Sequence, residues 1–166
     1  LKYDPNSLHS DEDRGLQIKT ATKAHGMLEE LAFYDRQITD IRSSVELILK
    51  NDIPDEQLKK ELSSLLNNMI KKRKELVNDK IGYITVEEQL REKISGLYGA
   101  IIRFDGRPTV SQINKLEIYE EELNGVKSEL SEIIDVVVPD LNNKLERSDL
   151  PKIEVISYEE YLEEES

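Results

Sequence analysis

The sequence contains no cysteine and no tryptophan among its 166 residues. Without thiols the chain cannot form disulfides, bind zinc through thiolates or use a cysteine nucleophile. Basic residues are in the minority, because 23 Lys and Arg stand against 35 Asp and Glu, which gives a formal net charge of -12. Such a surface repels the phosphates of nucleic acids and of anionic lipids. We therefore expect no nucleic-acid partner.

Long apolar runs are also missing. No run approaches the roughly 18 residues that indicate a membrane-spanning helix, so we expect no membrane insertion. No signal peptide opens the chain, and its first residue is Leu rather than Met. We expect the chain to be a piece of a longer or processed protein.

Glycine and proline are scarce, with seven and five residues, and apolar residues recur every three or four positions in four blocks. In the last block the stripe consists of Leu116, Tyr119, Leu123, Val126, Leu130, Ile133 and Val137. This spacing places the side chains on one face of a helix, and such a face is buried against other helices. The sequence therefore predicts an all-α, antiparallel up-down bundle of four main long helices over residues 1–153. Residues 154–166 form an acidic tail.

The four helices are predicted over residues 11–50, 54–77, 86–104 and 110–138. Ser10, Thr85 and Thr109 are candidate N-caps, and the last two begin capping boxes. Pro139 lacks an amide donor and clashes with the preceding turn, so it predicts a kink or a break with a short fifth helix over 140–146. The tail is expected to be irregular. It is either disordered or anchored on a surface by Tyr158, Tyr161 and Leu162.

No motif in the sequence identifies a catalytic site. A di-iron centre in a helical bundle needs Glu-x-x-His on two helices, and neither His9 nor His25 lies in that motif. Neighbouring carboxylates such as Glu87 and Glu88, or residues 120–122, point around a helix and do not converge. The basic residues 71–74 either stabilise a helix C-terminus or form an anion patch or nuclear signal. We expect no catalytic residue, metal or cofactor.

Gly96, Gly99 and Ala100 form a smooth strip on the third predicted helix. Glycine in a helix interior costs about 0.5–1 kcal/mol relative to alanine. Two glycines so close together indicate the tight approach of another backbone. We expect this partner to be the first or fourth helix of the bundle, or alternatively another domain.

Two stretches of the sequence resemble a known family. The first is Leu97-Tyr98-Gly99-Ala100 with residues 105–112 (Asp-Gly-Arg-Pro-Thr-Val-Ser-Gln), and the second is residues 138–142 (Val-Pro-Asp-Leu-Asn) with Leu145 and residues 150–153. They resemble the C-terminal helical region of large bacterial proteins with BNR/sortilin-type (VPS10-like) β-propellers, often labelled glycosyl hydrolases. Residues 3–6 (Tyr-Asp-Pro-Asn) resemble the junction where the propeller ends, although the family more often has Arg in place of Asn6.

The resemblance covers the chain up to about Ile153. It implies that the chain is an accessory domain of a larger exported protein, periplasmic or extracellular, and that its partner is the β-propeller of the same polypeptide. Any glycan-binding or hydrolase-like site would belong to the propeller, whose residues have no counterparts in this chain.

We therefore expect a non-catalytic helical domain that packs on a propeller or positions it. The expected contact residues lie where the regular pattern is interrupted, and they are Gly96, Gly99, Ala100, Asp105, Arg107, Pro108, Thr109, Pro139, Leu141 and Asn142. The alternative is a module that forms a homodimer or binds partner helices. A third hypothesis is a metal-dependent enzyme that uses carboxylates of the bundle.

Overall fold

The computed structural model describes residues 9–78, 88–104 and 106–164. All regular secondary structure among these residues is helical, which confirms the predicted all-α class. In chain order the elements are α1 (Asp11–Ile48), α2 (Glu56–Leu76), α3 (Leu90–Arg103), α4 (Val110–Glu132), the π-helical turn η1 (Ile133–Val137), α5 (Val138–Arg147) and α6 (Tyr158–Glu164).

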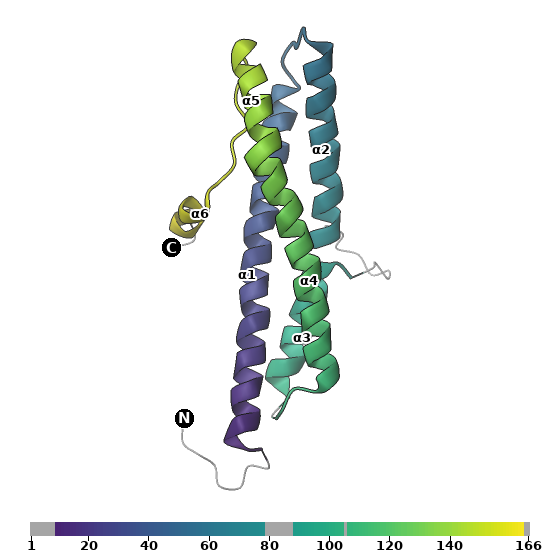
Figure 1. Ribbon diagram of the computed structural model, residues 1–166, viewed down its shortest axis with the longest axis vertical. Helices are drawn as coiled ribbons and strands as arrows, with labels where there is room; N and C mark the ends of the chain where they lie inside the picture. The colour runs from purple at the N-terminus through teal and green to yellow at the C-terminus, as the bar shows by residue number, and fades with distance from the viewer. Residues whose placement is uncertain (1–8, 79–87, 105, 165–166) are drawn as a thin grey trace.

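The helix α1 runs along the full length of the bundle, and the other helices pack beside it (Figure 1). The helices α2 and α3 follow one another down α1, and α4, η1 and α5 then return as one long helix. Ion pairs fix this register, because Arg73 of α2 contacts Asp35 of α1 and Lys144 of α5 contacts Glu61 of α2, both at 2.8 Å. The helices α2 and α3 thus lie one after the other on the same side of the bundle, between α1 and the long returning helix (Figure 1).

Two predicted caps of these helices are confirmed. Ser10 and Asp13 form a capping box at the start of α1, and Thr109 and Gln112 form one at the start of α4. The start of α2 differs from the prediction, because the Asp55 side chain accepts bonds from the backbone of Gln57 and so begins the helix at residue 56 rather than 54. Thr85 lies outside the described residues, and α3 begins at Leu90.

The predicted short fifth helix near Pro139 is present as α5, but it is joined to α4 without an intervening loop. The chain widens into the π-helical turn η1 just before it, where the Val138 N–H donates to the carbonyl of Ile133, five residues back. Pro139 then occupies the first turn of α5, where a missing amide donor matters least. The inserted turn thus lets α4 continue into α5, and α5 begins two residues earlier than the predicted short helix.

The end of α5 turns the chain back toward α1. The Leu150 N–H donates to the Leu145 carbonyl and the Asp149 N–H donates to the Glu146 carbonyl, which is the hydrogen-bond pattern of a Schellman motif. Asp149 has a φ of 54°, as the motif requires. Residues 150–164, which we call the strap, then run to α6 beside α1 (Figure 1).

Candidate interaction surface

The connection between α3 and α4 lies at the end of the bundle where α1 begins (Figure 1). We call this region the loop end. Gly106 and Pro108 are buried there. The ring of His9, just before α1, lies where a side chain at position 106 would project, so that a Cβ atom would be 2.9 Å from His9 Nδ1. Glycine therefore permits the chain entering α1 to pack on this loop.

A glutamine of α1 joins the loop end to α3. Gln17 Nε2 donates to the carbonyl of Ile101 at 2.8 Å and also to the carbonyl of Phe104. These carbonyls lie at the end of α3, where the helix offers no amide partner. The sequence analysis missed Gln17, because 84 residues separate it from Ile101 and no local pattern marks such a pair.

Arg107 places its guanidinium beside the acidic first turn of α1. Its Nη1 lies 3.4 Å from Asp13 Oδ1 and 3.9 Å from Glu12 Oε1. Hydrogen bonds from Ser10, and then the bond and charge of Arg107, lower the pKa of Asp13 below its usual value. The predicted contact residue Arg107 thus ties the loop to α1, while more than half of its side chain stays exposed.

Large apolar side chains are exposed at the loop end. The exposed fractions are 62% for Ile18, 49% for Ile102, 54% for Phe104 and 74% for Val110. They come from the start of α1, the end of α3 and the start of α4. A shallow hollow of about 280 Å³ lies between α1 and α3 on the same half of the bundle, and Ile18, Thr22 and Tyr98 are among its lining residues.

The strip of Gly96, Gly99 and Ala100 lies on α3 with its small side chains toward open space. A Cβ atom added at Gly96 or Gly99 would meet nothing within 4 Å among the described residues, and Ala100 is exposed. The expectation that α1 or α4 packs closely on this strip is therefore wrong, because the seam of α3 is formed by Ile94, Leu97 and Ile101 instead. Contact with another domain stays a prediction.

The remaining predicted contact residues lie apart from this region. Pro139, Leu141 and Asn142 belong to α5, at the opposite end of the bundle from the loop end (Figure 1). Pro139 is exposed and Leu141 is buried in the core. Asn142 holds the strap within the chain: its Nδ2 donates to the Ile153 carbonyl at 3.0 Å, and its Oδ1 accepts from the Ile153 N–H at 2.7 Å. Asp105 lies outside the described residues.

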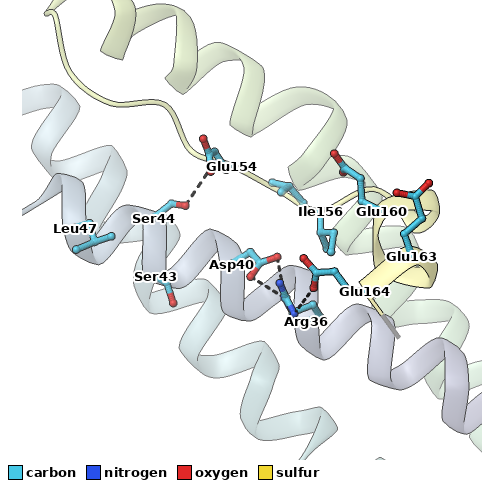
Figure 2. Close-up of a pocket in the computed structure, with 11 residues that line it drawn as sticks. Arg36, Asp40, Ser43, Ser44, Leu47, Glu154, Ile156, Glu160, Glu163 and Glu164 are labelled. Atoms are coloured by element: carbon cyan, nitrogen blue, oxygen red, sulfur yellow. Dashed lines mark hydrogen bonds and ion pairs between the residues drawn. The ribbon is translucent and has the colours of Figure 1, made fainter. Parts of the chain in front are cut away.

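The described part of the chain shows no arrangement typical of a metal centre. Within it, no group of three or more His, Asp or Glu side chains could hold a metal ion. A cleft of about 850 Å³ between α1 and the strap is lined mainly by carboxylates on one flank and by α1 on the other (Figure 2). In the ranges that the structure covers, no helix is long and apolar enough to cross a membrane.

Comparisons with known proteins add no relative. No family model, curated protein or solved structure matches this chain.

Proposed function

We propose that this chain is a non-catalytic helical domain that docks through its loop end on a domain preceding it in the same polypeptide. The observation that carries the proposal is the exposure of Ile18, Ile102, Phe104 and Val110 where α1 begins. Several large apolar side chains exposed at one end of a bundle favour contact with another protein surface.

The path of the chain supports docking at this end. His9 packs on Gly106, and its ring centroid lies 6.2 Å from that of Phe104. The segment that enters α1 is thereby tied to the same loop that carries the exposed side chains. A domain that precedes this chain would be tethered through eight further residues to the end of the bundle that carries this surface, and the family resemblance of the sequence suggests that this domain is a β-propeller.

The size of the surface favours a tethered partner over a free one. Full burial of one such side chain contributes about 1.5–3 kcal/mol, so the exposed parts of these four together offer roughly 4–7 kcal/mol. Association of two free proteins costs about 4–15 kcal/mol in lost translation and rotation. A covalent linker removes much of that cost by raising the effective concentration of the partner, so the surface suffices for docking within one polypeptide.

Site-specific photo-crosslinking in the longer polypeptide tests this proposal. A photoreactive residue at Ile102 or Val110 should crosslink to the preceding domain, whereas one at Asn67, which is exposed on α2 away from the loop end, should not. Equal crosslinking from all three positions, or none from Ile102 and Val110, would contradict the proposal.

The second candidate function is self-association, and a separate feature favours it. Val136 and Val137 of η1 are 62% and 37% exposed. They line a groove of about 480 Å³ between η1, α5 and α2, with Leu65 on its other side. Light scattering of this chain separates the two functions. If the chain is a monomer and the Ile102→Ser variant is also a monomer, the result agrees with tethered docking. If the chain is a tight dimer and Val136→Ser dissociates it, the result supports self-association.

A further inference from the structure

The strap is held on α1 in two parts of different character. The first part centres on Ile153, whose side chain is buried and whose backbone N–H and carbonyl both form hydrogen bonds with the side chain of Asn142 on α5. Two bonds from α1 continue the attachment, because Ser44 Oγ accepts from the Glu154 N–H at 3.3 Å and Gln37 Nε2 donates to the Ile156 carbonyl at 3.1 Å. This part is fixed by buried apolar surface and paired backbone groups.

The second part is α6, which has no buried residue. It is seven residues long, and isolated helices shorter than about 12–15 residues are marginal in water. A capping box between Ser157 and Glu160 supports its first turn. Its contacts with α1 include Tyr158 and Tyr161 against Phe33, with ring centroids at 5.1 and 5.3 Å, and an ion pair of Glu164 with Arg36 at 2.9 Å.

The charges around this contact are unbalanced. The cleft between α1 and the strap is lined by the carboxylates of Asp40, Glu154, Glu160, Glu163 and Glu164, and Arg36 is the one cation among the described residues that line it (Figure 2). The guanidinium is also shared, because Arg36 Nε bonds Asp40 at 3.0 Å on its own helix while Nη1 reaches Glu164. Four carboxylates are thus left without an equal positive charge.

We propose that α6 is a charge-gated latch, docked on Phe33 of α1 by its two tyrosines and opposed by the carboxylates of the cleft. Repulsion among like charges falls when salt screens them or when a carboxylate is neutralised. The latch therefore closes as the ionic strength rises, and the Ile153 part of the strap stays attached in both states. Opening uncovers Phe33 and the α1 surface beside it. This inference concerns the strap and does not depend on docking at the loop end.

The ion pair and the repulsion predict opposite responses, which makes the proposal testable. If the Arg36–Glu164 attraction dominated, salt would weaken docking. If the summed repulsion dominates, salt strengthens it. Because the chain has no cysteine, Lys19→Cys and Glu159→Cys introduce two spin labels at defined places on α1 and α6, and the distance distribution between them reports the docked population of the full chain.

We expect a rise from 20 to 500 mM NaCl to increase the ratio of docked to undocked α6 about threefold, since the Debye length shrinks from about 20 Å to about 4 Å. Glu163→Gln should raise the same ratio about 1.5- to 2-fold at low salt, the size expected for removing one like-charge neighbour. Glu117→Gln, an exposed position on α4 outside the cleft, is the matched control and should change nothing.

Phe33→Ala provides a second measurement, because it removes the aromatic contact and leaves the charges. It should lower the docked population at every salt concentration. A decrease in the docked population of α6 as salt rises would overturn the proposal. A distance distribution that changes neither with salt nor with Glu163→Gln would overturn it as well.

Discussion

Replacing Asn142 by alanine tests the bond network that holds the strap. The two hydrogen bonds to Ile153 contribute about 1 kcal/mol each, and their loss also leaves a buried N–H and carbonyl to be rehydrated. Water can reach part of this site, because Asn142 is only half-buried. We therefore expect the strap to open more easily by about 2–3 kcal/mol.

Amide hydrogen exchange measures this local opening directly. A loss of 2–3 kcal/mol should speed exchange at the Ile153 amide by about 30- to 150-fold. Amides in the centre of α1, such as that of Ile38, should change little because they exchange through larger openings. The effect should therefore be confined to the strap and the residues that contact it.

Asn143→Ala is the matched control for this change. Asn143 is the exposed neighbour of Asn142 on α5, so its replacement gives the same gain in helix propensity without touching Ile153. If the two variants exchanged equally fast at Ile153, the Asn142 bonds would contribute nothing to holding the strap, and the reasoning above would be refuted.

Two further predictions concern stability, and a third concerns the position of a side chain. Asp149→Gly should raise the free energy of unfolding by about 0.5 kcal/mol, because glycine adopts a positive φ more readily at the C′ position of a Schellman motif, and an unchanged denaturation midpoint would argue against strain there. Bonds from Lys144 and from Lys72 lower the pKa values of Glu61 and Glu129 below their usual 4.5. The contribution of these two pairs to the free energy of unfolding is complete above about pH 4.5 and is lost as the pH falls through the lowered pKa values of the folded state. The melting temperature of Glu129→Gln should therefore depend less on pH between 5 and 3 than that of the parent chain. Gly106→Ala should displace the ring of His9, which would shift the NMR signals of the ring protons. Unchanged signals would show that the loop backbone moves and the ring does not.

The strap illustrates where sequence reasoning stops. Residues 154–166 read as acidic and poor in core residues, and the alternatives were disorder or anchoring by the tyrosines. The structure places Tyr158 and Tyr161 against Phe33, as the anchored alternative expected. The expectation of an irregular tail is wrong for residues Tyr158–Glu164, which form α6. Phe33 is more than 120 residues from both tyrosines in the chain and carries no local signal for this role.

The glycine strip illustrates the opposite error. Paired small residues on a helix predicted the close approach of another backbone, from a helix of the bundle or from another domain, and the structure contradicts only the first of these, because a Cβ atom at Gly96 or Gly99 would meet nothing within 4 Å among the described residues. Glycines within a helix indicate a surface without side chains, but they do not indicate which element, if any, packs on that surface. The capping boxes at Ser10 and Thr109 were predictable because all of their bonds lie within four residues.

The sequence by itself determined the all-α class, most of the helical seams, and the caps of α1 and α4, because these depend on hydrophobic periodicity and on bonds between near neighbours. The seam prediction failed at Val137, which is 37% exposed because η1 shifts the buried position to Val138. Only the tertiary structure decided that α2 and α3 pack one after the other along α1, that η1 joins α4 to α5 ahead of Pro139, and that the apolar side chains of the loop end stay exposed. These outcomes depend on how far each helix extends against its neighbours, which is set by packing between residues distant in the chain.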